Sequence, residues 1–246
     1  MGDFTGKAAL VTGGARGIGA AIVRHLAKGG ARVAFTYVRS EDKAARLVAE
    51  LEAQGQHAVA IQADSGDVDA VRKSVDRAAA VLGGLDILVN NAGVFPSGPF
   101  EAVTVEELDR TLSIHVRGVF VASQAALAHM KQGGRIISIG TCFAQRVPHG
   151  GVTLYAMTKS ALIGLTKGLA RDVGGRGITV NVVDPGPTDT DMNPADGPHA
   201  AGELALMAIK QFAGPDDIAA TVGHLAGPGG RFITGASIAV DGGINA

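Results

Sequence analysis

The sequence predicts an α/β fold: a single doubly wound Rossmann-like domain, with a central parallel sheet of about seven strands flanked by helices on both faces. Three observations support this prediction. Short apolar runs alternate with helical patterns along the chain, as a parallel sheet with crossover helices requires. A chain of 246 residues suits one sizeable domain. A glycine-rich turn follows the first apolar run directly.

The apolar runs give the expected strands, at residues 7–12, 31–37, 57–62, 85–90, 134–140, 178–183 and 237–240. A representative helix is expected at residues 41–54, where apolar side chains recur with helical spacing at Ala44, Leu47, Val48 and Leu51. Ser40 is its expected N-cap, and Gly55 can end it. No linker divides the chain, so we expect one domain over residues 1–246.

Composition narrows the possible partners. The formal net charge of -1 offers no electrostatic attraction for nucleic acid or for an anionic membrane, and we expect neither as a partner. No apolar run is long enough to cross a bilayer, and the N-terminus does not resemble a signal segment. With Cys142 as the single cysteine, the chain is expected to be cytoplasmic. No metal site is expected.

The glycine-rich turn occupies residues 12–19, between the first expected strand and helix. Gly13 permits a tight turn, Gly17 lets the backbone approach a pyrophosphate, and Gly19 lets the helix pack closely on the strand. The amides at the start of the helix would then face an anion. The alternative is a turn into a helix that binds no ligand; its place at the first strand–helix junction favours nucleotide binding.

The pattern Thr-Gly-x-x-x-Gly-x-Gly at 12–19 resembles the cofactor turn of short-chain dehydrogenases/reductases. Further matches lie at 90–93, at Tyr155-x-x-x-Lys159, at 185–190, at 214–219 and near the C-terminus, so the resemblance covers essentially the whole chain. It is closest to the 3-oxoacyl-[acyl-carrier-protein] reductase and carbonyl reductase branch. That branch implies reduction of a small-molecule carbonyl substrate and assembly as a homotetramer.

The end of the second strand indicates which dinucleotide binds. An NAD enzyme tends to carry an acid there, whereas this chain has Tyr37, Arg39 and Ser40. Arg39 and Arg16 could pair with a 2′-phosphate, which favours NADP(H) over NAD, although both could be solvated surface charges. The complete set of expected cofactor residues, several of them implied only by the resemblance, is Gly13, Arg16, Gly17, Ile18, Gly19, Tyr37, Arg39, Ser40, Asp64, Asn91, Ala92, Gly93, Tyr155, Lys159, Pro185, Gly186, Thr188 and Thr190.

Tyr155 and Lys159 are the expected catalytic pair. Reduction of a carbonyl needs an acid that protonates the developing alkoxide, and a nearby cation would lower the pKa of a tyrosine. Positions i and i+4 share one helical face, so the two side chains can act together. The resemblance adds that Lys159 binds the nicotinamide ribose. The alternative is an ordinary pair on a helix surface.

Two expected catalytic positions depart from the family pattern. The family has a serine at the end of the fifth strand; alignment of residues 137–141 assigns this role to Thr141, whereas spacing from Tyr155 points to Cys142. A hydroxyl donates better than a thiol, so Thr141 is preferred. His115 stands where the family usually has an asparagine that holds a water. Imidazole could fill that role, or His115 could only pack.

Residues 191–212 are expected to form a substrate lid. Apolar walls could come from Phe95, Phe143, Val147, Pro148, Met192 and Met207. The sequence thus predicts an NADPH-dependent carbonyl reductase with Tyr155 as proton donor. Two alternatives remain: a NAD-linked alcohol dehydrogenase, and a non-catalytic regulatory protein that binds a nucleotide on the same fold.

Overall fold

The computed structural model describes residues 2–246 and contains a seven-stranded sheet in the order β3-β2-β1-β4-β5-β6-β7. Every neighbouring pair of strands runs parallel, which confirms the predicted fold class. The strands are β1 (Ala8–Val11), β2 (Arg32–Tyr37), β3 (Ala58–Gln62), β4 (Leu85–Asn90), β5 (Met130–Ile139), β6 (Thr179–Pro185) and β7 (Ser237–Val240).

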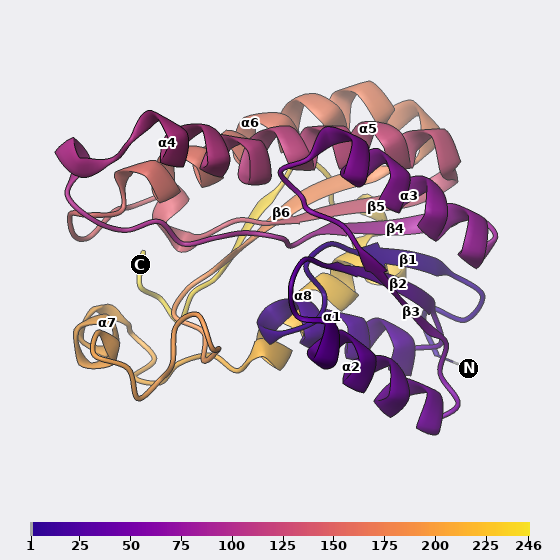
Figure 1. Ribbon diagram of the computed structural model, residues 1–246, viewed down its shortest axis with the longest axis horizontal. Coiled ribbons are helices and arrows are strands. Elements are labelled where there is room, and N and C mark those ends of the chain that lie inside the picture. Colours follow the sequence, from indigo (N-terminus) through magenta and orange to yellow (C-terminus); the bar gives the residue numbers. More distant parts are fainter. Residues whose placement is uncertain (1) are drawn as a thin grey trace.

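Helices cover both faces of this sheet (Figure 1). One face carries α1 (Gly17–Lys28), α2 (Glu41–Ala53) and α8 (Pro215–Ala226), and the other carries α3 (Val68–Leu82), α4 (Val105–Leu112), α5 (Val119–His129) and α6 (Thr153–Val173). Each face has its own core of aliphatic side chains, as expected for strands buried on both sides. A π-helical segment, η2 (Ser113–Gly118), joins α4 to α5.

Most element boundaries fall within one or two residues of those predicted. The exception is β5, which begins at Met130 instead of residue 134, because Met130 pairs with Leu85 before a register shift. Ser40 does precede α2, but its side chain makes no capping hydrogen bond, so the predicted cap is absent. Gly55 follows the C-cap residue Gln54 with φ 73°, so α2 ends where predicted.

The sheet order places the expected site segments along one edge. The chain moves outward from β1 to β2 and β3, and then returns to add β4 on the other side of β1. In a parallel sheet, ligands bind beyond the carboxyl ends of strands at such a reversal. The glycine turn, residues 90–93, residues 140–142 and residues 185–190 follow β1, β4, β5 and β6, so all four meet at this edge.

The expected lid connects β6 to α8. It contains one short helix, α7 (Ala200–Leu206), and lies beside the same carboxyl edge (Figure 1). Met207 and Phe212 are buried, so the end of this segment is packed against the domain. Within residues 2–246, no helix is long and apolar enough to span a membrane.

Candidate active site

The glycine turn after β1 is shaped for close contact between backbones. Gly13 has φ 65°, and its amide donates to the Thr36 hydroxyl over 3.0 Å. A Cβ on Gly19 would lie 2.4 Å from the Gly13 carbonyl oxygen, so no larger residue fits there. Helix α1 begins at Gly17 without a side-chain cap on its first amides. Those free amides and the positive end of the helix dipole fit a pyrophosphate.

Thr12 and Asn91 hold this turn against the end of β4. The Thr12 hydroxyl accepts the amides of Asn91 and Ala92, each over 3.0 Å. In return, the Asn91 side-chain amide donates to the carbonyls of Thr12 at 2.9 Å and Gly13 at 3.0 Å. Thr12, which the predicted set omitted, therefore brings together three predicted residues: Gly13, Asn91 and Ala92.

The cations expected at the 2′-phosphate lie on the surface near this turn. Arg16 pairs with Asp191 at 3.0 Å, and Lys43 of α2 pairs with the other oxygen of the same carboxylate at 2.7 Å. The Arg39 side chain is exposed, as a phosphate ligand must be, and Tyr37 and Ser40 are partly buried beside it. Sequence reasoning missed Lys43 and Asp191, because nothing in the local pattern joins α2 to the lid.

Asp64 follows β3, where the resemblance places an adenine contact. Its carboxylate accepts a hydrogen bond from the Gly66 amide at 2.8 Å. The Arg110 guanidinium of α4 donates to both carboxylate oxygens at 3.0 Å. Partial burial opposes ionisation, but these donors hold the pKa of Asp64 below its usual value. Arg39 contributes to the same lowering, so Asp64 lies within the electrostatic reach of the expected phosphate ligand.

Tyr155 lies among aromatic rings near the carboxyl edge of the sheet. Its ring meets Phe95, His115 and Phe143 edge-on, with centroids 4.8, 5.8 and 6.5 Å away. The expected lowering of its pKa is wrong for this structure: burial raises the pKa of Tyr155 to about 12, although a hydrogen bond from Thr141 offsets part of the rise. Lys159 does not act as the dominant charge on the phenol here, and Tyr155 is protonated at neutral pH.

Lys159 lies one helical turn further along α6, as predicted, and is 5% exposed. Its ammonium donates to the Ile139 carbonyl at 2.6 Å. It also faces Gly93, where a Cβ would lie 3.5 Å from Nζ. Burial lowers the pKa of Lys159 to about 8, and the negative charge of Asp184 works against that decrease. Lys159 therefore lies beside the segment that follows β4.

The structure separates the two candidates for the serine position. The Thr141 side chain lowers the pKa of Tyr155, which places it beside the phenol, and its amide donates to Asp184 at 3.1 Å. Cys142 instead packs with Met207 and Ile244 under the lid, and burial raises the pKa of its thiol to about 12. A neutral thiol in an apolar cluster is a poor donor, so the geometry favours Thr141.

Both nitrogens of the His115 ring are used inside the protein. The Val94 amide donates to Nε2 at 3.0 Å, and Nδ1 lies 2.9 Å from the Thr158 hydroxyl. Because Nε2 accepts, the proton is on Nδ1 and the ring is neutral. Burial and the Lys159 charge lower the pKa of His115 to about 3. No ring nitrogen remains for a water, which favours the packing alternative.

Residues 185–190 run from the end of β6 over the glycine turn. A Cβ on Gly186 would lie 2.6 Å from Asp241 Cα, so a glycine is needed where this segment crosses the C-terminal turn. The Thr188 hydroxyl donates to the Gly186 carbonyl at 3.0 Å. The Thr190 methyl lies 3.4 Å from the position of a Cβ on Gly17, so Thr190 directly faces the first residue of α1.

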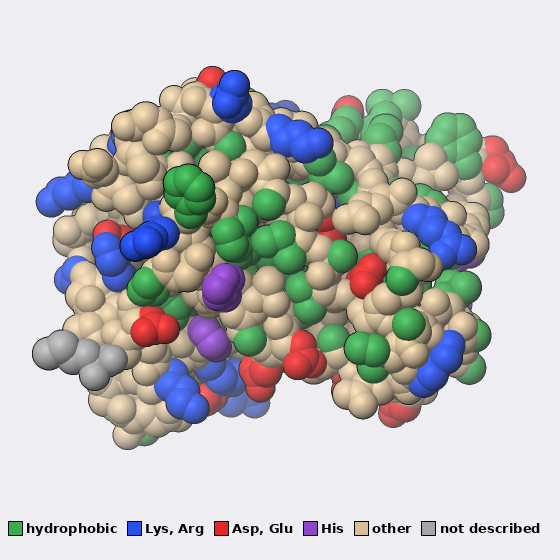
Figure 2. Space-filling view, turned by 180° about the vertical axis from the view of Figure 1, so that it is seen from behind, with side chains coloured by type: hydrophobic (Ala, Val, Ile, Leu, Met, Phe, Trp, Pro, Cys, Tyr) green, Lys and Arg blue, Asp and Glu red, His purple; other side chains and the backbone are tan. Residues whose placement is uncertain are grey.

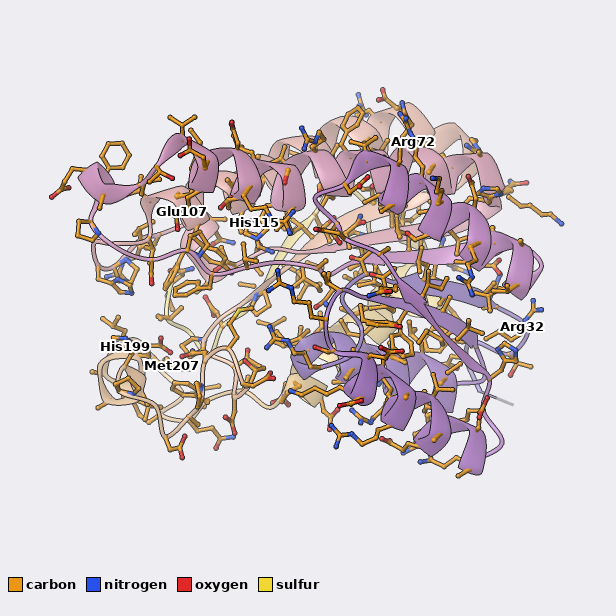
Figure 3. All side chains as sticks on the ribbon, viewed as in Figure 1. Arg32, Arg72, Glu107, His115, His199 and Met207 are labelled. Carbon is orange, nitrogen blue, oxygen red and sulfur yellow. The ribbon has the colours of Figure 1, made fainter. Side chains whose placement is uncertain are left out.

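The side chains expected to line the substrate site differ in where they lie. Phe95 and Phe143 flank Tyr155, and Val147 and Met192 are exposed. Met207 is 2% exposed and belongs to the cluster with Cys142, so it supports the lid instead of lining an open cleft. Figure 3 shows His115 among the side chains under the helical layer and Met207 on the lid segment opposite.

Comparison with known proteins identifies the family. A family model described as enoyl-(acyl carrier protein) reductase matches residues 13–245. A short-chain dehydrogenase from Burkholderia cenocepacia J2315, solved in complex with NADP, is 57% identical with a TM-score of 0.98, covering 99% of this chain and 100% of that one. The chain belongs to the short-chain dehydrogenase/reductase family.

Two further relatives of this family bear on function. A blue fluorescent protein from a metagenomic library, solved with NADPH, is 57% identical with a TM-score of 0.97, covering 99% of this chain and 100% of that one. An Escherichia coli K12 protein, named as a cyclic-di-GMP-binding biofilm dispersal mediator, is 47% identical over 246 residues and covers both chains completely. The fold and the resemblance stated from the sequence are thereby confirmed.

Proposed function

We propose that this protein reduces a carbonyl to an alcohol with NADPH, and that Tyr155 donates the proton. The observation that carries the proposal is the grouping of three polar groups at the carboxyl edge of the sheet. Thr141 lies near enough to the Tyr155 phenol to lower its pKa, and the Lys159 ammonium faces Gly93. An oxygen that gains negative charge needs such a pair of donors with a cation nearby.

NADP(H) is the cofactor that fits this chain. Solved structures of relatives more than half identical to it contain NADP or NADPH. The free amides of α1 suit the pyrophosphate, and Arg16, Arg39 and Lys43 offer positive charge near the end of β2. When bound, the reduced nicotinamide supplies the hydride. The family resemblance assigns Lys159 to the nicotinamide ribose and Asn91 to the lining of the cofactor site.

The protonation states of Tyr155 and Lys159 indicate which group supplies the proton for reduction. With pKa values of about 12 and about 8, Tyr155 and Lys159 both carry their protons at pH 7. Tyr155 can therefore donate to the alkoxide, while Thr141 donates a second hydrogen bond to the same oxygen. Lys159 adds a positive charge to the site in which the substrate oxygen and then the phenolate become negative.

The substrate class follows from the walls around Tyr155. Phe95 and Phe143 present ring edges to the phenol, and Phe95 is partly exposed at 42%. Aromatic side chains favour apolar and planar ligands. We therefore assign a small or medium-sized apolar ketone, with aryl ketones and 3-oxoacyl thioesters as the first compounds to test.

The test combines a substrate panel with two variants. Wild-type protein should oxidise NADPH with at least one ketone or 3-oxoacyl thioester, followed by absorbance at 340 nm. Tyr155→Phe should lower kcat by about 100-fold to 10,000-fold while leaving NADPH binding intact, because only the proton donor is lost. Lys167→Gln, on the exposed side of the same helix, serves as a matched control. Near-normal turnover in the phenylalanine variant contradicts the mechanism.

Three alternatives give different results in the same assays. A NAD-linked alcohol dehydrogenase would bind NADH at least as well as NADPH. Reduction of an enoyl thioester but of no ketone would match the description of the family model. A regulatory protein would bind NADPH and reduce nothing; the name of the E. coli relative makes cyclic-di-GMP the second ligand to titrate.

We also propose assembly as a homotetramer in the cytoplasm. Large apolar side chains are exposed on α4, α5, α6 and just before β7, at Val105, Phe120, Met157 and Phe232. Phe232 is 96% exposed, which is unusual for an isolated chain. Figure 2 shows hydrophobic side chains gathered among scattered charges of both signs on one face. Light scattering should give four times 24.8 kDa, and Phe232→Ser should lower that mass.

A further inference from the structure

Asp184 is a buried carboxylate that none of the roles above requires. It lies near the end of β6 and has no exposed surface. One oxygen accepts the Thr141 amide at 3.1 Å, and the other accepts the Ser237 hydroxyl of β7. The Gln145 side chain also lowers the pKa of this carboxyl group and so favours its ionised form. A fully buried acid is rare unless such partners stabilise it.

The position of this carboxylate is fixed by its neighbours. A Cβ on Gly140 would lie 2.0 Å from Asp184 Oδ1, so the carboxylate rests directly against the backbone before Thr141. The Gly140 amide is itself held by the Val183 carbonyl at 2.7 Å. Asp184 therefore determines where the chain leaves β5, and with it where the Thr141 hydroxyl points.

The charge of Asp184 also acts on the catalytic pair. It raises the pKa of Lys159 and Tyr155 on α6 and that of Cys142 in the segment after β5. His115 of η2 faces Lys159 from the other side but is neutral. Asp241 and Glu203 act on Cys142 and are not among the causes that shift Lys159 or Tyr155. Asp184 is thus the buried negative charge that both catalytic groups share.

We propose that Asp184 is a positioning residue of this active site: it fixes the backbone of Thr141 between β5 and β7 and places a buried negative charge at the catalytic end of the sheet. The inference rests on the proposed reductase function, because it assigns Thr141 and Lys159 their roles. Burial raises the pKa of Asp184, but the Ser237 hydroxyl, the Thr141 amide and the Lys159 ammonium all favour its ionised form.

Loss of the Asp184 charge should lower the pKa values of both Lys159 and Tyr155. Removing a buried negative charge makes the Lys159 cation less stable and the Tyr155 anion more stable, so both pKa values fall. Reduction needs Lys159 and Tyr155 in their protonated forms, so its rate at alkaline pH must fall with them.

The test is Asp184→Asn, which keeps the shape and one acceptor oxygen but removes the charge. The alkaline limb of kcat/KM should move down by about one pH unit, which lowers reduction at pH 9 about tenfold relative to wild type. Ser237→Ala is the matched control, because it removes one donor and retains the charge; its alkaline limb should stay in place. An unshifted limb in a folded Asp184→Asn variant overturns the proposal.

A second readout does not depend on turnover. The chain has two tyrosines and no tryptophan, so tyrosinate absorbance at 295 nm in a Tyr37→Phe background reports on Tyr155 alone. At pH 10.5, adding Asp184→Asn should increase the ionised fraction several-fold, with circular dichroism confirming the fold. If no carbonyl is reduced but the absorbance rises, the reductase function fails while the electrostatic coupling stands. If reduction is normal and neither readout shifts, the role of Asp184 fails alone.

Discussion

The two halves of the site are built from different chemistry. Around the glycine turn, backbone amides and neutral hydroxyls shape the groove, and the charges of Arg16, Lys43 and Asp191 are about half exposed. Around Tyr155, the charges are internal: Lys159 is 5% exposed and Asp184 is fully buried. Water screens the first group and not the second. Shape and salt should therefore control the cofactor half, whereas pH should control the catalytic half.

Among the changes that distinguish the two halves, the largest effect is expected from a change to the shape of the cofactor half. In Gly19→Ala, the new methyl would lie 2.4 Å from the Gly13 oxygen and 2.5 Å from the Asn91 side chain. Overpacking of about 1–3 kcal/mol predicts NADPH binding that is weaker by about 10-fold to 100-fold, measured by NADPH fluorescence. Gly168→Ala, where a Cβ meets no atom within 4 Å, is the control and should bind normally.

The second prediction concerns the pH dependence of reduction, which depends on the catalytic half. Because Lys159 loses its proton at a pKa of about 8, kcat/KM for reduction should fall about tenfold per pH unit above that value. Below it, from pH 6 to pH 7.5, the rate should be nearly constant, since Tyr155 remains protonated throughout. A flat profile to pH 10 would remove Lys159 from the mechanism.

A smaller effect concerns the exposed cations. Arg16→Ser should reduce the preference for NADPH over NADH about tenfold at low salt, and less at 0.5 M salt because the charge is exposed. Arg24→Ser removes another half-exposed arginine of α1, one that pairs with Glu50, and should leave the preference unchanged. Equal results for the two variants would show that Arg16 does not read the 2′-phosphate.

The smallest effect is expected at His115. The ring is neutral above a pKa of about 3, and both its nitrogens are occupied, so His115→Asn should change kcat less than about threefold. The pH profile between 5 and 8 should stay the same. A wild-type acid limb near pH 6.5 that asparagine abolishes would show that the ring titrates during turnover.

The same contrast explains how much could be predicted from the sequence. Glycine spacing and the Tyr-x-x-x-Lys pattern are local, so the turn at 12–19 and the pair on α6 follow from the sequence directly. Partners that the fold brings together are not visible there. Asp184 meets Ser237 from 53 positions away, and Asp64 meets Arg110 from 46 positions away. The raised pKa of Tyr155 also escaped prediction, because it depends on burial that only the packed structure reveals.

The two ion pairs of Asp191 have a consequence for how cofactor enters. They join the first residue of the lid to Arg16 of the glycine turn and to Lys43 of α2. A dinucleotide phosphate that takes Arg16 must displace this carboxylate, so one anion is exchanged for another and few salt ions are released. Affinity for NADPH would then fall less steeply with ionic strength than binding to unpaired cations would, and the freed lid would be ready to fold over the substrate.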